Sequence, residues 1–361
     1  MGLEFGIFYE LSVPRPWDGE SERKVYENAL EQVRLADEVG FKHVWAVEHH
    51  FLEEYSHCSA PEIFLTACAA QTKNIRVGHG IVICVPEFNH PIRIAERAAV
   101  LDIVSGGRLE FGTGRSATWT ELGGFGANPD ETKNSWDEFV HTIPKMWTQE
   151  RFGYEGEYFS MPTRAVLPKP YQKPHPPMWV AVSTPGTEMD AADRGMGALG
   201  VNFTTFKAQE ERVEEYRRRI QNCNPCGEVV TDQLASANFL YCHEDSAVGV
   251  STGRKMIGNF QYLAGQLDMA KEAYPTKGYP SPGLLAATRR QAAGPGEANE
   301  PPEGIAIGNP DQIVRELKKW EATGVDRINF ILNASEIIPQ DQVLESLRVF
   351  GREVIPQFEG S

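Results

Sequence analysis

Residues 75–113, IRVGHGIVICVPEFNHPIRIAERAAVLDIVSGGRLEFGT, decide the fold because they hold a strand, a helix and a second strand in succession. Residues 75–85 are apolar, as expected of a buried strand, and residues 91–104 have the spacing of a helix that begins at a proline. Residues 108–113 form the next short apolar strand. This order predicts two parallel strands joined by a crossover helix, the repeating unit of α/β proteins.

The same alternation continues along the chain. The predicted strands cover residues 3–9, 43–47, 75–85, 108–113, 178–182, 198–203, 234–241 and 325–332. The predicted helices cover residues 25–39, 59–70, 91–104, 130–147, 188–194, 208–221, 246–270, 311–322 and 340–354. Such a series of strand–helix steps favours an α/β fold of the (β/α)8 TIM-barrel type over an open doubly wound sheet.

The length of 361 residues permits two domains, but a barrel with insertions also reaches this size as one unit. We predict a single domain over residues 1–361, because two proline-rich stretches interrupt the alternation without separating two halves. Residues 150–177 are expected to be an insertion with a small hairpin at 154–158. Residues 274–304 exceed an ordinary connection and are our candidate lid.

The composition excludes several classes of protein. Hydrophobic residues make up 41% and charged residues 24%, the balance of a globular protein. The formal net charge of −15 disfavours nucleic acid and anionic membranes as partners, because their phosphates attract basic surfaces. No run approaches the length of about 18 apolar residues that spans a membrane. The first residues lack a secretory pattern, so we expect a cytoplasmic protein with reduced cysteines.

The histidine pair His49-His50 follows the second predicted strand, at the barrel end where active sites lie. Histidine changes charge near neutral pH and can transfer protons during turnover. Adjacent residues of an extended segment point in opposite directions, which disfavours one metal shared by the pair. We therefore expect proton transfer or substrate contact and no metal site, with a role in the core as the alternative.

The segment Ser183-Thr184-Pro185-Gly186-Thr187 follows the fifth predicted strand and directly precedes a helix. Hydroxyls and free backbone N–H groups at such a point can bind a phosphate. The alternative is that Ser183 or Thr187 only caps the helix. Arg115 and Lys133 are candidate cations for the same phosphate, although each alone is also typical of a surface charge.

Two further motifs are interpreted without a catalytic role. Residues 123–126, GGFG, lack the lysine of a phosphate-binding P-loop and are expected to form a flexible loop. Cys223 and Cys226 form a lone CxxC without a second pair of ligands, which disfavours a zinc site.

Several motifs together resemble a known family. They are residues 44–51 (VWAVEHHF), Asn89-His90-Pro91 with Ala95-Glu96, residues 105–112 (SGGRLEFG), Ala192-Asp193-Arg194-Gly195 and residues 343–356. In this order they resemble the bacterial-luciferase-like family of flavin-dependent monooxygenases. The resemblance covers nearly the whole chain and is weakest over residues 150–175 and 225–305.

The resemblance implies a (β/α)8 barrel with insertions, in agreement with the pattern above. It implies that reduced FMN arrives from an NAD(P)H-dependent flavin reductase and reacts with O2 to form a flavin C4a-(hydro)peroxide. This species would oxygenate a small organic substrate. Because the family often forms dimers, the resemblance also implies a homodimer.

The resemblance assigns roles to individual residues. His49 matches the family histidine linked to acid–base steps, and His50 matches its neighbour in the same pocket. Gly80-Ile81 matches a non-prolyl cis peptide beside the flavin, and Gly114 stands where luciferase has a reactive cysteine, which argues against light emission and an aldehyde substrate. The residues that match the family's flavin-phosphate site are Arg115, Lys133, Val182, Ser183, Thr184, Gly186 and Thr187.

An apolar pocket would protect such a flavin adduct from water. The candidates for its wall lie on predicted strand-end loops, and they are Phe88, Trp119, Phe125 and Phe203. Packing between loops is the alternative interpretation of these four side chains.

Three other functions stay open. A deazaflavin-dependent oxidoreductase shares the family fold but transfers a hydride without O2. A flavin-binding subunit without catalysis and an oxidoreductase without flavin are the other two. Binding of reduced FMN or of the deazaflavin, followed by reaction with O2, separates them.

Overall fold

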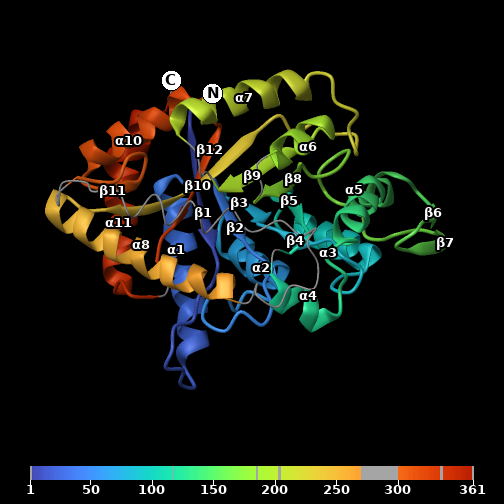
Figure 1. The fold of residues 1–361 in the computed structure, drawn as a ribbon, viewed down its shortest axis with the longest axis horizontal. Coiled ribbons are helices and arrows are strands. Elements are labelled where there is room, and N and C mark those ends of the chain that lie inside the picture. Colours follow the sequence, from blue (N-terminus) through green and yellow to red (C-terminus); the bar gives the residue numbers. More distant parts are fainter. Residues whose placement is uncertain are drawn as a thin grey trace.

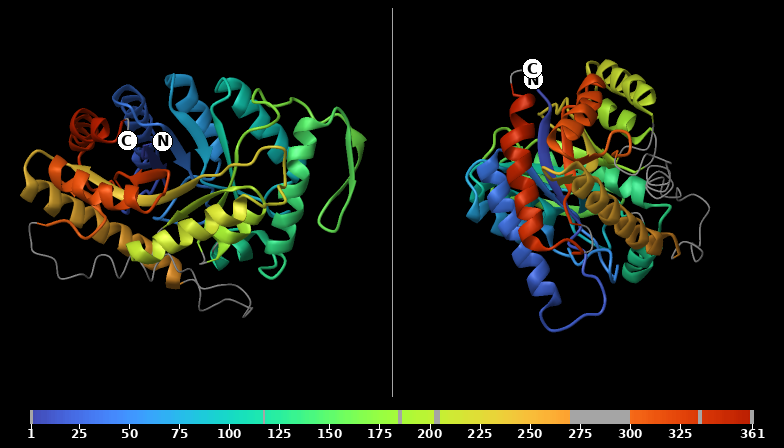
Figure 2. Two further views of the ribbon diagram at one scale, coloured as in Figure 1. Left: turned by 90° about the horizontal axis from the view of Figure 1, so that it is seen from above. Right: turned by 90° about the vertical axis from the view of Figure 1, so that its left-hand side faces the viewer.

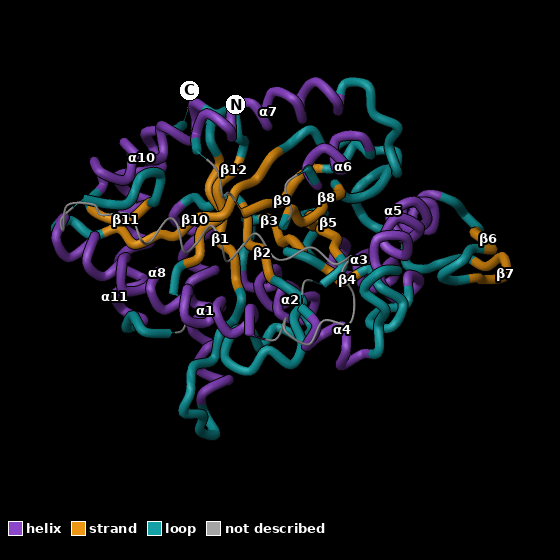
Figure 3. The backbone as a smooth tube through the Cα atoms, in the orientation of Figure 1, coloured by secondary structure: helices purple, strands orange, loops and turns teal. Residues whose placement is uncertain are grey.

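The computed structural model describes residues 2–116, 118–183, 186–201, 205–269, 300–333 and 336–359. Within these residues a ring of parallel strands closes into a barrel, formed in order by β1 (Glu4–Tyr9), β2 (His43–Ala46), β3 (Arg76–His79), β5 (Leu109–Gly114), β8 (Met178–Val182), β9 (Gly197–Val201), β10 (Leu234–Cys242) and β12 (Arg327–Ile331). The ring closes because β1 pairs with both β2 and β12, and β10 pairs with both β9 and β12. Figures 1 and 3 show the strands at the centre with helices around them. The predicted (β/α)8 barrel is confirmed.

The helices that surround the barrel follow the predicted order. They are α1 (Ser21–Val39), α2 (Pro61–Gln71), α3 (Pro91–Val104), α5 (Thr132–Thr148), α6 (Thr187–Asp193), α7 (Phe206–Ile220), α8 (Ser246–Met269), α10 (Pro310–Ala322) and α11 (Gln340–Val349), which continues as η2 (Phe350–Val354) and η3 (Ile355–Gln357). Local chemistry sets their ends. Asn309 and Gln312 form a reciprocal capping box at the start of α10. Gly40, with φ of 104°, ends α1 in a left-handed conformation that glycine adopts without strain.

The third predicted strand, residues 75–85, is interrupted in the structure. It is divided into β3 and the short strand β4 (Val82–Ile83). The carboxylate of Glu48 accepts a hydrogen bond from the backbone N–H of Ile83 at 2.6 Å. In an uninterrupted strand this N–H group would be available to pair with the backbone of a neighbouring strand. The interruption therefore lies at the strand end where the site is expected.

The prediction of a flexible loop at residues 123–126 is wrong. Residues in this stretch belong to the helix α4 (Trp119–Phe125). The Thr118 hydroxyl caps its start by accepting a hydrogen bond from the Glu121 N–H at 3.2 Å, and Gly126, with φ of 75°, ends it. Caps at both ends stabilise a short helix despite two internal glycines.

The insertion contains the predicted hairpin, formed by β6 (Phe152–Glu155) and β7 (Ser160–Arg164). Figure 2 shows it projecting from the side of the barrel. The short strand β11 (Ala306–Gly308), which the sequence did not predict, pairs with the end of β10. Residues 274–299 of the candidate lid lie outside the described residues. Among the described helices, none has the length and apolar character needed to cross a membrane.

The amino-terminal half of the barrel interior is filled. The rings of Trp45 and Trp179 meet edge to face with centroids 5.4 Å apart. Glu110 accepts a hydrogen bond from the Trp179 indole at 2.6 Å and pairs with Arg76 and, at 3.5 Å, with Arg327. Since Arg76 and Arg327 begin their strands, this layer closes the bottom of the barrel and leaves the open space at the carboxyl ends.

Candidate active site

A cavity of about 240 Å³ lies at the carboxyl ends of the barrel strands. Residues that the sequence singled out contribute to its wall, namely His49, Gly80, Ile81, Gly114, Arg115, Lys133, Val182, Ser183 and Thr187. Thr184 and Phe203 lie outside the described residues. The structure thus gathers residues from β2, β3, β5, β8, α5 and α6 around one space.

Other candidates lie elsewhere. Five candidates are among the described residues but do not line the cavity. They are His50, Gly186, Phe88, Trp119 and Phe125. The ring of Phe125 lies 4.9 Å from that of His50 and 4.1 Å from that of Phe88, measured between centroids. These aromatic side chains therefore pack around His50. Gly186 adopts a φ of 97° and donates its N–H to the Glu188 carboxylate at 2.9 Å, so it forms the turn before α6.

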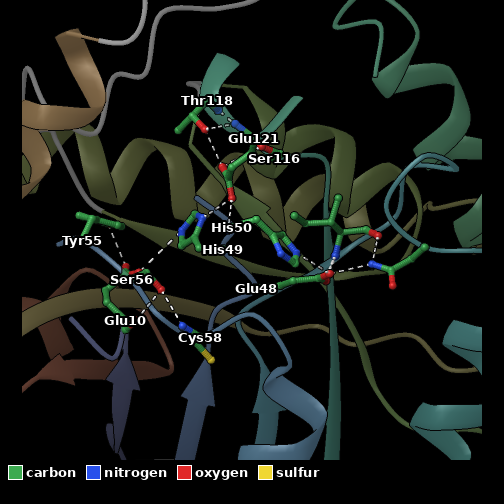
Figure 4. A network of polar contacts seen from close by, with 12 residues as sticks. Glu10, Glu48, His49, His50, Tyr55, Ser56, Cys58, Ser116, Thr118 and Glu121 are labelled. Carbon is green, nitrogen blue, oxygen red and sulfur yellow. Dashed lines mark hydrogen bonds and ion pairs between the residues drawn. The ribbon is translucent and has the colours of Figure 1, made fainter. Parts of the chain in front are cut away.

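His49 lies between two buried carboxylates, as Figure 4 shows. Its Nδ1 is 2.9 Å from the Glu121 Oε1, and its Nε2 is 3.7 Å from the Glu10 Oε2. Burial alone would lower the pKa of His49, but the charges of Glu121, Glu10 and Glu48 and the hydrogen bond to Glu121 raise this pKa to about 9. His49 is therefore a cation at neutral pH, with one nitrogen facing Glu121 and the other facing Glu10.

Glu121 is held as an anion. Its Oε1 accepts the His50 backbone N–H at 3.0 Å besides the contact with His49, and its Oε2 accepts the hydroxyls of Ser116 at 3.0 Å and Thr118 at 2.7 Å. Burial works to raise its pKa, but His49 and these donors outweigh burial, and the pKa is lowered. An ionised Glu121 fixes the proton on the Nδ1 of His49 and orients the ring.

Glu10 follows β1 and lines the cavity. Its Oε1 accepts the Tyr55 hydroxyl at 3.0 Å, whereas its buried Oε2 has no hydrogen-bond partner in the described structure. Burial raises the pKa of Glu10, and the charge of His49 and the Tyr55 hydroxyl oppose that rise. One carboxylate oxygen therefore has spare capacity to accept a hydrogen bond beside the cavity.

Glu48 joins His50 to the barrel scaffold. One of its oxygens accepts the Ile83 N–H at 2.6 Å, and the other accepts the Asn89 amide at 2.7 Å. The His50 Nε2 lies 3.3 Å from the same carboxylate. His50 is thus anchored to β4 and to the start of α3, while His49 faces the cavity.

The cations gather near neighbouring strands. Arg115 follows β5 and Ser183 follows β8, and these strands pair directly. Arg115 donates to the Thr132 hydroxyl at 3.1 Å, and the Lys133 ammonium lies 3.0 Å from Asp190, which also lines the cavity. This part of the wall offers the guanidinium of Arg115, the ammonium of Lys133 and the hydroxyl of Ser183.

The structure does not have a cis peptide at Gly80–Ile81. The cis bonds of the described residues precede Pro16, Pro168 and Pro174. The Gly80–Ile81 peptide is therefore trans, the form favoured at non-prolyl bonds. One bond earlier, the Gly80 N–H donates to the Ala46 carbonyl at 2.7 Å and extends the pairing of β3 with β2. At Gly114, a Cβ atom would lie 2.6 Å from the Ile81 Cδ1, so any larger residue there would force the Ile81 side chain to move.

Sequence reasoning missed Glu10, Glu121 and Tyr55. Glu10 stands directly after the first predicted strand, so the rule that sites lie at strand ends could have identified it. Glu121 lies in a stretch where glycines obscured a helix. Tyr55 comes from the segment after β2, and no pattern in the sequence indicates that its hydroxyl reaches Glu10.

The fold is a closed parallel barrel, and the cavity at its carboxyl ends is lined by a protonated histidine and buried carboxylates. These features together define a TIM-barrel enzyme. The family model described as luciferase-like monooxygenase matches residues 3–327, and the chain belongs to this family. The expected family is therefore confirmed, and the protein is an oxidoreductase of the monooxygenase class.

Known proteins agree with this assignment. The oxygenase component of a flavin-dependent trigonelline monooxygenase from Acinetobacter baylyi is 25% identical over 99% of this chain and 96% of its own length. The oxygenating constituent of 3,6-diketocamphane monooxygenase from Pseudomonas putida, solved with FMN, has a TM-score of 0.75 at 19% identity over 99% of both chains. A coenzyme F420 dependent tetrahydromethanopterin reductase from Methanopyrus kandleri has a TM-score of 0.68 at 19% identity over 99% of this chain and 100% of its own. The two structural likenesses show a shared fold.

Proposed function

We propose that the protein is the oxygenase of a two-component system that uses reduced FMN and O2 to oxygenate a small organic substrate. An NAD(P)H-dependent reductase would supply the reduced flavin, and a flavin C4a-(hydro)peroxide would be the oxygenating species. One observation carries the proposal: Arg115, Lys133 and Ser183 line the same cavity as the protonated His49.

The residues of the cavity fit FMN. Arg115, Lys133 and the Ser183 hydroxyl are suited to a phosphate, because cationic side chains form strong charge-assisted hydrogen bonds with it. Asn329 also lines the cavity, and both polar atoms of its buried amide lack a hydrogen-bond partner in the described structure. An amide with a free donor and a free acceptor suits the polar edge of a flavin ring, which carries both kinds of group.

The side chains of the chain would orient, shield and protonate the reactants. Bound reduced FMN supplies the electrons that activate O2. His49 holds a proton at its Nε2, on the cavity side, and can donate it to an oxygen atom of a bound molecule. Phe8, Phe239 and Phe260 contribute apolar surface to the wall, which limits water and favours an apolar substrate.

The test is an anaerobic titration with FMNH2, followed by rapid mixing with O2. Saturable binding and a transient flavin–oxygen adduct in the absorbance spectrum are expected. Parallel titration with the deazaflavin separates the hydride-transfer alternative, which would show tighter deazaflavin binding and no reaction with O2. Binding of FMNH2 without any adduct would favour the non-catalytic subunit, and absence of flavin binding would refute the proposal.

We also propose that the protein is a homodimer that associates through α2 and α3. Large apolar side chains on these two helices are exposed, and they are Ile63, Val100, Ile103 and Val104. Helices α2 and α3 contact each other, so the four side chains lie on adjoining elements. Exposed apolar patches of this kind are typical of interaction surfaces.

Light scattering during size-exclusion chromatography tests the dimer. The wild type is expected to elute as a dimer, and Ile63→Asp is expected to dissociate it. Val230→Asp, at an exposed apolar residue outside these helices, is the matched control and is expected to stay dimeric. A monomeric wild type would refute this part of the proposal.

A further inference from the structure

The contacts of His49 differ at its two ring nitrogens. Nδ1 faces Glu121, whose two oxygens accept from His50, Ser116 and Thr118 besides His49. Nε2 faces the Glu10 Oε2 across 3.7 Å, a distance too long for a hydrogen bond. Because Glu121 fixes the Nδ1 proton, the second proton of the cationic ring is on Nε2, the nitrogen that faces the unpartnered oxygen of Glu10.

The backbone beside Glu10 gives an independent indication. Leu11 has a φ of 52°, although its side chain is large and buried. Phe51, with φ of 62°, follows His50, and Ser116, with φ of 64°, follows Arg115. Positive φ is unfavourable for such residues and persists where the surrounding structure enforces it, which occurs most often at functional sites. The chain therefore turns directly after Glu10 in the same way that it turns after two other residues of the site.

We propose that Glu10 is a positioning residue for proton transfer, because its free Oε2 faces the Nε2 of His49 at the cavity wall and its charge keeps the transferable proton on that nitrogen. This inference rests on the proposed function, since it concerns how the same site delivers a proton. In the step, the N–H bond at Nε2 breaks, the electron pair stays on the nitrogen and the proton bonds to an oxygen atom of a bound molecule. Glu10 remains an anion, and neutral His49 regains its proton from solvent.

The other groups near His49 do not replace Glu10. Glu121 from α4 binds at Nδ1, on the opposite edge of the ring. Glu48 from the segment after β2 is committed to Ile83, Asn89 and His50. Tyr55 donates to the Glu10 Oε1 and leaves Oε2 free. Glu10 is therefore the carboxylate in position to attract a proton toward the Nε2 edge.

The experiment is an NMR titration of the histidine rings in the flavin-free protein, with His49 assigned by its loss in His49→Gln. Glu10→Gln keeps the size of the side chain and an acceptor for Tyr55 but removes the charge. We expect the titration midpoint of His49 to fall by about 1 pH unit or more, as the loss of an opposite charge at this distance predicts. Glu10→Asp, which restores the charge on a shorter side chain, is expected to recover part of the shift.

Glu27→Gln on the exposed side of α1 is the matched control and is expected to leave the His49 midpoint unchanged. An unchanged midpoint in Glu10→Gln, or a wild-type His49 that is neutral at pH 7, would overturn the inference. Reduced FMN is titrated into the same variants. If Glu10→Gln binds FMNH2 and forms the adduct normally while its His49 midpoint is unchanged, only the role of Glu10 is refuted. If the wild type does not bind the flavin, the proposed function is refuted.

Discussion

At the scale of single residues, His49 combines burial with a retained positive charge. The imidazole is 19% exposed at its side chain, and an isolated cation in such a position would lose its proton. The ionised Glu121 reverses that preference, because several donors stabilise its own charge. The largest of the contributions that keep His49 protonated thus comes from Glu121, a buried side chain that is not among the residues lining the cavity.

Replacement of His49 by alanine removes the proposed proton donor. For His49→Ala we expect FMNH2 to bind as in the wild type while product formation falls by roughly a hundredfold, the lower range of general acid–base catalysis. Flavin fluorescence measures binding, and product is quantified for any substrate found to be oxygenated. An unchanged product yield would exclude His49 from the chemical step.

The pKa of His49 also predicts how stability depends on pH. The folded-state pKa of about 9 is above the ordinary value of 6.5, so His49 stabilises the fold fully below pH 6.5. This contribution is lost as the pH rises through about 9. Urea unfolding at pH 6.5 and 9.5 should therefore show a larger loss of unfolding free energy in the wild type than in His49→Gln. Equal losses in the two proteins would contradict the raised pKa.

Arg115 is the residue that tests the phosphate end of the cavity. Because a hydrogen bond to a charged group contributes about 1.5–3 kcal/mol, Arg115→Ala is expected to weaken FMN binding by about tenfold to a hundredfold. Arg348→Ala, at an exposed residue of α11, serves as the control and is expected to bind FMN normally. An unaltered dissociation constant for Arg115→Ala would remove this residue from the phosphate site.

At the scale of secondary-structure elements, α4 shows how a site residue escapes prediction. Two glycines in residues 119–125 lower the helix propensity, and the sequence indicated a loop there. The helix forms because Thr118 caps its start, and the same hydroxyl also donates to Glu121. One threonine therefore links the helix boundary to the histidine, a link that only the folded chain reveals.

Thr118→Ala tests that link. We expect the unfolding free energy to fall by about 1 kcal/mol from loss of the cap, and the His49 ring resonances to shift because Glu121 loses a donor. Thr205→Ala removes the comparable cap of α7, where the threonine hydroxyl accepts the Ala208 N–H at 3.3 Å. It should destabilise the protein to a similar degree and leave the His49 resonances in place. Identical spectra for Thr118→Ala and the wild type would contradict the link.

At the scale of the whole molecule, the sequence predicted the barrel because its strands have strong local patterns. Each barrel strand lies within a residue or two of its predicted bounds, apart from the break before β4. The site was predictable where a residue lies within a few positions of a strand end, as Arg115 and Ser183 do directly after β5 and β8 and His49 does three residues after β2. Glu121 and Tyr55 reach the site from a helix and a loop, and their positions depend on packing that no local pattern encodes.

The filled half of the barrel depends on small inward residues. A Cβ atom on Gly78 would lie 2.3 Å from the Trp45 ring, so Gly78→Ala is expected to destabilise the fold by about 1–3 kcal/mol through overpacking. Gly258→Ala is the matched control, because its Cβ atom meets nothing within 4 Å and alanine favours the helix. Urea unfolding should show opposite signs for the two variants, and a neutral Gly78→Ala would contradict the packing of Trp45.

The central claim is that one cavity holds the phosphate of FMN near Arg115 and Ser183 and places its ring beside His49. A crystal structure of the protein with FMN tests it most directly. The account predicts hydrogen bonds from Arg115 and Ser183 to the phosphate and a flavin ring against the imidazole of His49. A phosphate bound away from both residues, or a flavin ring outside the 240 Å³ cavity, would contradict it.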